Sequence, residues 1–180
     1  LDGSQWDEDG DSFSYVARLD SSGQWDWAVG MGGPDDQGQI VISETTLVEG
    51  VVRFRVVSDS NDWYRIGTSN HTLPADGGSW DHILGAIDAG DGSVLWSHDV
   101  YLQGDSGAES ASHILVDSDG STFYWGGFNG ELHWDGEVIL GLYGLSPWGA
   151  GANSSSYMLK VSADGTLLWS VMTNSTQNQS

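Results

Sequence analysis

One segment of this chain occurs three times, and this repetition constrains the fold more than any other feature. Tyr15–Trp27 reads YVARLDSSGQWDW, and Tyr157–Trp169 reads YMLKVSADGTLLW. A looser copy, Ile83–Trp96, reads ILGAIDAGDGSVLW and has one more residue in its central turn. The three closing tryptophans are 69 and 73 residues apart. A unit that recurs at a near-constant spacing indicates a repeat architecture.

Each copy predicts a β-hairpin. In the first copy, odd-numbered residues of the segment 15–19 fall on one side of an extended strand and even-numbered residues on the other. Asp20 and Gly23 favour a turn after it, because Asp bonds nearby backbone and Gly accepts a positive φ. Trp25 and Trp27 are two residues apart, so we expect them to share one face of the second strand.

A second kind of hairpin lies between the copies. Residues 113–125 read as strand, turn and strand, and residues 51–67 keep this pattern with few of the same residues. Helix signals are almost absent, because no long stretch has a 3.6-residue period and 26 glycines interrupt the chain. We therefore expect an all-β fold of β-propeller-like, four-stranded antiparallel repeats, about two and a half blades in all.

The alternating hairpins carry specific motifs. Tyr15–Trp27 and Tyr157–Trp169 match the form Phe/Tyr-x-Ala-Lys/Arg-Leu-Asp-x-x-Gly-x-x-x-Trp, and Val116–Gly127 matches x-x-Val-Asp-x-x-Gly-x-x-Tyr-x-x-Gly. This alternation resembles the SBBP-type β-propeller repeats of secreted bacterial and archaeal proteins. The middle copy departs from the pattern, with Gly85 and Ala86 in place of the small-then-basic pair. The resemblance implies a large surface-associated protein, usually without an assigned reaction.

The number of repeats predicts an incomplete array. Closed propellers have four or more blades, whereas 180 residues hold about two and a half units of this spacing. We expect a single β-repeat domain over 1–180, with repeat hairpins near 13–29, 82–98 and 155–171. An incomplete array exposes apolar faces and strand edges. The chain is therefore expected to be part of a longer polypeptide or to associate with copies of itself.

The composition excludes several classes of partner. The chain has 26 acidic and 5 basic residues, a formal net charge of −21. Such a surface repels phosphate groups, so we expect no nucleic-acid partner and no anionic membrane surface. No apolar run approaches the roughly 20 residues that span a bilayer, so membrane insertion is not expected. The absence of cysteine excludes disulfides, zinc fingers and thiol catalysis.

Four sequons favour an extracellular or cell-surface location and a glycoprotein. Such triplets also arise by chance in a serine-rich chain. They begin at Asn70, Asn153, Asn174 and Asn178.

Clusters of carboxylates suggest calcium as a cofactor. Asp7, Asp9 and Asp11 alternate around a glycine, which suits the oxygen ligands that calcium prefers. Asp117 and Asp119 form a shorter version. The competing interpretation is that Asp-x-Asp-Gly is ordinary hairpin-turn chemistry, and we favour it for the shorter cluster. Both interpretations stay open for the Asp7 cluster.

The tryptophans permit two roles. Because Trp27, Trp96 and Trp169 recur in register, we expect them to take equivalent buried positions between blades. Tryptophans outside that register are candidates for stacking on sugar rings, as in a lectin-like carbohydrate-binding propeller. These ligand-stacking candidates are Trp6, Trp63, Trp80, Trp134 and Trp148.

No catalytic pattern is visible in the sequence. The five histidines lack metal-ligand spacing, and no nucleophile elbow or phosphate-binding glycine motif occurs. We therefore expect no catalytic residues and a non-enzymatic, extracellular structural or adhesive module, for example a self-assembling subunit of a surface layer or filament. The alternatives are the lectin-like propeller and, third, a glycoside hydrolase or other hydrolase, because abundant Asp makes any carboxylate pair uninformative.

Overall fold

The computed structural model describes residues 13–32, 40–58, 63–72, 81–103, 111–128, 131–141 and 155–173. Every regular element in these ranges is a β-strand, so the all-β prediction is confirmed. The strands form three antiparallel sheets, and none of the three closes on itself. The propeller-like arrangement therefore stays a prediction.

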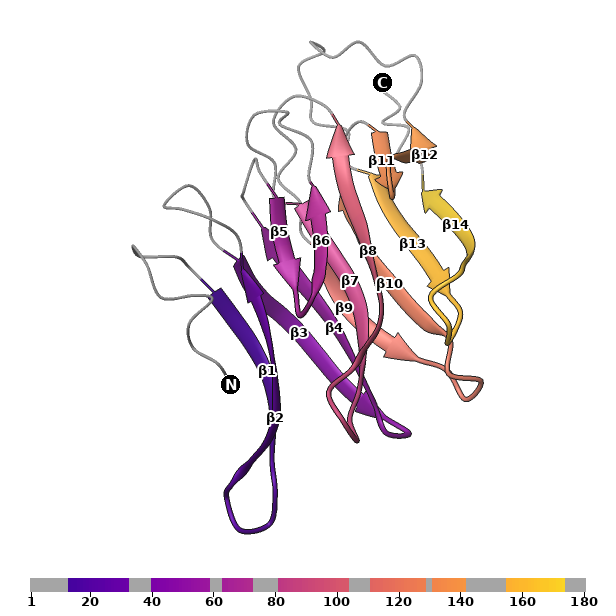
Figure 1. Cartoon of the computed structure of the whole chain (residues 1–180). Coiled ribbons are helices and arrows are strands. Elements are labelled where there is room, and N and C mark those ends of the chain that lie inside the picture. Colours follow the sequence, from indigo (N-terminus) through magenta and orange to yellow (C-terminus); the bar gives the residue numbers. More distant parts are fainter. Residues whose placement is uncertain are drawn as a thin grey trace, which may run out of the picture.

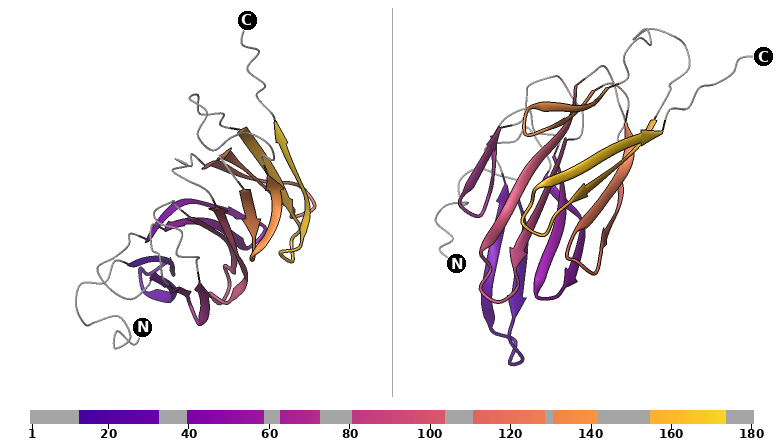
Figure 2. Two further views of the ribbon diagram at one scale, coloured as in Figure 1. Left: turned by 90° about the horizontal axis from the view of Figure 1, so that it is seen from above. Right: turned by 90° about the vertical axis from the view of Figure 1, so that its right-hand side faces the viewer.

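The three sheets stack in chain order, with β1 and β14 at opposite ends of the stack (Figures 1 and 2). The N-terminal sheet contains β1 (Phe13–Leu19), β2 (Trp25–Gly32), β5 (Trp63–Ile66) and β6 (Ser69–Thr72), in that order. The middle sheet contains, from edge to edge, β12 (Glu137–Gly141), β11 (Glu131–Trp134), β8 (Val94–Gln103), β7 (Asp81–Asp88), β4 (Val51–Ser58) and β3 (Ile40–Val48). The C-terminal sheet contains β14 (Leu167–Thr173), β13 (Ser155–Val161), β10 (Thr122–Phe128) and β9 (Ala111–Val116).

Two of the three sheets have the four antiparallel strands that the sequence predicts, and the middle sheet has six. The predicted repeat hairpins are β1–β2, β7–β8 and β13–β14, one in each sheet. In the middle sheet, β7–β8 is flanked by the hairpin β3–β4 on one side and the short hairpin β11–β12 on the other. The middle sheet therefore has one hairpin more than each of the two four-stranded sheets. Within the described ranges, the N-terminal sheet lacks a counterpart of β3–β4, and the C-terminal sheet lacks one of β11–β12.

A β-bulge occurs at the same place in all three repeat hairpins. In the first, Arg18 pairs with Trp27 but the next residue, Leu19, pairs with Trp25, so one residue is inserted between the tryptophans. The same shift occurs before Trp96 and before Trp169. Because a bulge reverses the alternation of faces, the expectation that Trp25 and Trp27 share a face is wrong.

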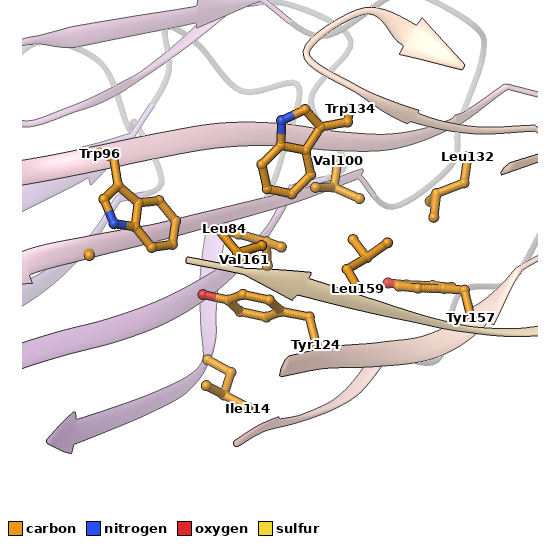
Figure 3. Close-up of a cluster of buried hydrophobic side chains, with 11 residues drawn as sticks. Leu84, Trp96, Val100, Ile114, Tyr124, Leu132, Trp134, Tyr157, Leu159 and Val161 are labelled. Carbon is orange, nitrogen blue, oxygen red and sulfur yellow. The ribbon is translucent and has the colours of Figure 1, made fainter. Parts of the chain in front are cut away.

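The middle sheet is covered on both faces. One apolar cluster fills the space between it and the N-terminal sheet, with Met31, Phe54 and Ile83 inaccessible to solvent. A second cluster lies between it and the C-terminal sheet (Figure 3) and includes Leu84 and Leu159. This position between two layers explains why β7 is buried along nearly its whole length. The two outermost sheets each have one face covered by the stack.

Candidate functional site

Each sheet is connected to the next by a contact between a tryptophan ring and the turn of the next repeat hairpin. This contact is called the tryptophan joint. The indole Nε1 of Trp27 in β2 donates a hydrogen bond to the carbonyl of Ala89, in the β7–β8 turn of the middle sheet, at 3.2 Å. The ring lies against Gly92 of the same turn, where a Cβ would stand 2.7 Å from a ring carbon of Trp27. Gly92 also has a φ of +79°, which favours glycine.

The same joint recurs between the middle and C-terminal sheets. Trp96 Nε1 donates to the carbonyl of Ala163 at 3.0 Å, and its ring lies against Gly165. Ala163 and Gly165 hold the same turn positions in the β13–β14 hairpin as Ala89 and Gly92 hold in β7–β8. Equivalent tryptophan and turn positions therefore make the contact at both interfaces between sheets.

The third tryptophan has no turn to pack on among the described residues. Trp169 is 41% exposed, whereas Trp96 is 9% exposed. The prediction of three equivalent buried tryptophans is therefore correct for Trp96, met only partly by the half-buried Trp27, and wrong for Trp169. The reason is positional, because no described sheet follows the C-terminal one. Conversely, Gly23 in the first turn has nothing within 4 Å of its ideal Cβ position.

The outward face of the N-terminal sheet carries exposed aromatic and aliphatic groups. Tyr15, Leu19 and Trp25 are 57%, 52% and 59% exposed. The rings of Tyr15 and Trp25 meet edge to face, with centroids 6.3 Å apart. The matching positions of the middle hairpin include Ile83 and Ile87, which are completely buried against the N-terminal sheet.

The outward face of the C-terminal sheet is also apolar. Met158, Trp169 and Val171 are exposed. Their counterparts Leu84 and Trp96 in the middle hairpin are buried. An open groove of about 480 Å³ lies on this face, and its lining is almost entirely apolar. The lining includes Leu115, Phe123, Trp125, Met158 and Val171.

A polar network connects the N-terminal and middle sheets. His71 of β6 lies between Ser97 and Asp99 of β8, with Nε2 2.8 Å from the Ser97 hydroxyl and Nδ1 2.8 Å from the Asp99 carboxylate. The hydroxyl of Tyr64 donates to the same carboxylate oxygen, and its ring stacks on His71 with centroids 4.9 Å apart. Burial of the phenol, together with the charge and hydrogen bond of Asp99, raises the pKa of Tyr64 well above its usual range.

The order Ser97, His71, Asp99 is the order of a nucleophile, a base and an orienting carboxylate in serine hydrolases. When His71 Nδ1 donates to Asp99, Nε2 is left to accept the hydroxyl proton of Ser97. One signal was visible in the sequence, because Ser97 and Asp99 are two residues apart on a strand and so share a face. No pattern in the sequence indicated that His71 from another sheet would join them.

A neighbouring hydrogen bond between His98 and Asp135 adds to this polar region. His98 Nδ1 lies 2.6 Å from one carboxylate oxygen of Asp135, and the backbone amide of Asp99 donates to the other at 3.0 Å. Partial burial opposes ionisation of Asp135. The hydrogen bonds from His98 and from the Asp99 amide outweigh that effect and lower the pKa of Asp135 below its usual value.

The predicted calcium ligands fall into two groups. Asp7, Asp9 and Asp11 lie outside the described residues. Asp117 and Asp119 lie in the β9–β10 turn, where Lys160 Nζ is 3.4 and 3.5 Å from their carboxylates. Within the ranges the structure describes, no three His, Asp or Glu side chains are placed to hold a metal ion.

The predicted sugar-stacking and glycosylation residues divide similarly. Trp134 is 8% exposed and packs in the core beside Val100 (Figure 3), so it lacks the exposed ring that stacking requires. The backbone of Trp63 begins β5, but its side chain lies outside the described part, as do Trp6, Trp80 and Trp148 entirely. Asn70 is exposed in the β5–β6 hairpin. The remaining sequons begin at Asn153, Asn174 and Asn178, outside the described residues.

The chain was compared with protein-family models, curated proteins and solved structures. No protein-family model, curated protein or solved structure matches the chain. The resemblance to SBBP-type repeats therefore stays a prediction. In the described ranges, no helix has the length and apolar character needed to cross a bilayer.

Proposed function

We propose that this protein is an extracellular, non-enzymatic structural module that acts as a subunit of a larger assembly, such as a surface layer or filament. The observation that carries the proposal is the pair of exposed apolar faces at the two ends of the sheet stack, represented by Trp25 and Trp169. Soluble monomers rarely leave large contiguous apolar patches uncovered. Two such faces at opposite ends suit a subunit with neighbours on both sides.

The charge of the protein is compatible with this role. A net charge of −21 keeps isolated subunits apart at low ionic strength and is screened as salt rises. Apolar association is not weakened by that screening. Assembly is therefore expected to be stronger in high salt than in low salt.

The experiment is sedimentation velocity on the purified chain over a range from low micromolar to near-millimolar concentration, followed by negative-stain electron microscopy. The proposal predicts species larger than the monomer that grow with concentration and with salt. A monomer at every concentration, in both low and high salt, would overturn it. Binding of the monomer to a glycan array without self-association would instead favour the lectin-like alternative.

One specific observation favours a second candidate function, hydrolysis by a serine nucleophile. Ser97, His71 and Asp99 have hydrogen-bond distances suited to a catalytic triad. Two features favour a structural role for the same residues. Asp99 is shared with Tyr64, and in the next interface Leu132 and Met172 stand at the positions of Tyr64 and Asp99 and pack in the apolar core.

A fluorophosphonate probe distinguishes these roles. Such probes react covalently with activated serines. If Ser97 is a nucleophile, the parent protein is labelled and Ser97→Ala is not, while Ser170→Ala, a change at the equivalent position of the third repeat, leaves labelling unchanged. If the network is structural, neither the parent nor the control is labelled, and Ser97→Ala lowers the free energy of unfolding by about 1 kcal/mol.

A further inference from the structure

We infer that two copies of this chain join head to tail, with the outward face of the C-terminal sheet of one copy on the outward face of the N-terminal sheet of the next. This inference rests on the proposed function and names the partner and the contact. The joint is a third instance of the contact that already occurs twice inside the molecule. Its centre is Trp169 of one copy on the Asp20–Gly23 turn of its neighbour.

The internal contacts between repeat hairpins all run in one direction along the chain. Trp27 of the first repeat hairpin binds the turn of the second, and Trp96 of the second binds the turn of the third. The series leaves one tryptophan, Trp169, and one turn, that of the first hairpin, without the contact among the described residues. A second copy supplies each with the missing half.

The turn of the first hairpin has the same backbone conformation as the turn of the third. The backbone amide of Gly23 donates to Asp20, and the amide of Gly165 donates to Ser162 in the same way. In both turns the first residue also bonds the carbonyl four residues later. Gly23 has a φ of +81° and Gly165 one of +91°. The carbonyl of Ser21 therefore takes the place that Ala163 has, and the open space at Gly23 receives the Trp169 ring.

Equivalent residues of the three hairpins differ in burial only at the two ends of the sheet stack. Leu19 and Trp25 are exposed, whereas Ile87 and Val161, the equivalents of Leu19, are completely buried. Val94 and Leu167, the equivalents of Trp25, pack against the two core clusters. This face is therefore covered in two hairpins and exposed only in the first, next to which no described sheet lies. The same holds for Met158 and Trp169 at the other end.

Such a contact is heterologous, because it joins two different surfaces. Repetition of a heterologous contact gives a ring if the rotation closes and an open filament if it does not. A twofold dimer, by contrast, uses the same surface on both partners. The proposed contact can therefore be distinguished from a symmetric dimer. Blocking either face alone should stop assembly beyond the monomer, and two chains blocked on different faces should still pair with each other.

The test uses one blocking variant for each face and a matched control. Trp169→Asp blocks the C-terminal face and Trp25→Asp the N-terminal face. Leu95→Asp is the control, because Leu95 is 47% exposed but lies on the middle sheet, away from both faces. Circular dichroism and urea denaturation first verify that each variant folds. Gly23→Ala, which fills the space meant for Trp169 with a single methyl group, is the milder second variant.

The expected results follow from the polarity of the joint. Each blocking variant sediments as a monomer where the parent assembles, and Leu95→Asp assembles like the parent. An equimolar mixture of Trp169→Asp and Trp25→Asp forms a dimer and nothing larger, through the one intact pair of faces.

Two other outcomes overturn the inference differently. If the parent assembles and the blocking variants do so equally well, the joint is wrong but the proposed function stands. If the parent is a monomer throughout, both fail, and the outward faces are then occupied by a further repeat of a longer polypeptide or by another partner.

Discussion

The substitution Gly165→Ala tests the tryptophan joint in the monomer. Gly165 has a φ of +91°, and an added Cβ would stand 2.7 Å from the Cγ of Trp96. The left-handed backbone alone costs an alanine about 1–2 kcal/mol. Displacing the packed ring adds the cost of overpacking, about 1–3 kcal/mol. We therefore expect Gly165→Ala to lower the free energy of unfolding by about 2–5 kcal/mol in total.

Gly23→Ala is the matched control for this measurement. Gly23 holds the same turn position with a φ of +81°, but nothing lies within 4 Å of its Cβ position. Only the backbone cost of about 1–2 kcal/mol applies to it. Urea denaturation at concentrations where the chain is monomeric measures both variants. Equal losses of stability in the two variants would refute the tryptophan joint, because the backbone strain would then account for the whole effect.

Three further predictions concern the polar groups. Tyr64→Phe removes a hydrogen bond to the partly buried Asp99, and urea denaturation should show a loss of about 1–3 kcal/mol; no loss would mean that His71 alone satisfies the carboxylate. Asp135→Asn should destabilise the protein at neutral pH. Because the pKa of Asp135 is lowered below 3.8, the difference in melting temperature between the variant and the parent should shrink as the pH falls through that lowered pKa. A difference in melting temperature that grows in acid would contradict this expectation. Millimolar calcium at constant high ionic strength should raise the melting temperature. At a hundredfold excess over the dissociation constant, the bound ion would raise the free energy of unfolding by about 3 kcal/mol. Asp9→Asn should remove most of that gain, whereas an equal effect of monovalent salt would leave only charge screening.

The sequence predicted those parts of the fold that repeat. The turn residues and the recurring tryptophan identified the three hairpins, because a turn glycine and a packed ring are local requirements that each copy must meet. The bulge was not predictable from spacing. Trp25 and Trp27 are two residues apart, which ordinarily means one face, and only the pairing of Leu19 with Trp25 reveals the inserted residue.

The short hairpins and the polar network could not be predicted for a different reason. Residues 51–67 were predicted to form one hairpin, and both strands exist, but β4 lies in the middle sheet and β5 in the N-terminal sheet, so the predicted pairing is wrong. The strands β5 and β6 have four residues each, too few for a periodic pattern to indicate their partners. β5 pairs with β2 although the hairpin β3–β4 lies between them in the sequence, and β6 pairs with β5. The contact of His71 with Ser97 and Asp99 depends on that pairing and on the stacking of two sheets. Burial of Trp169 was predicted wrongly because it depends on a neighbouring sheet, which the repeat register alone does not supply.

The most direct test of the sheet-stacking account is hydrogen exchange at the three repeat indoles, followed by NMR and assigned with single Trp→Phe variants. The account predicts slow exchange of the Trp27 and Trp96 indole protons at every concentration, because both are hydrogen-bonded to the turn of the next sheet. The Trp169 proton should exchange rapidly in dilute monomer and become protected as the protein assembles. Rapid exchange of Trp169 in the assembled state, or equal protection of all three indoles in the monomer, would contradict the account.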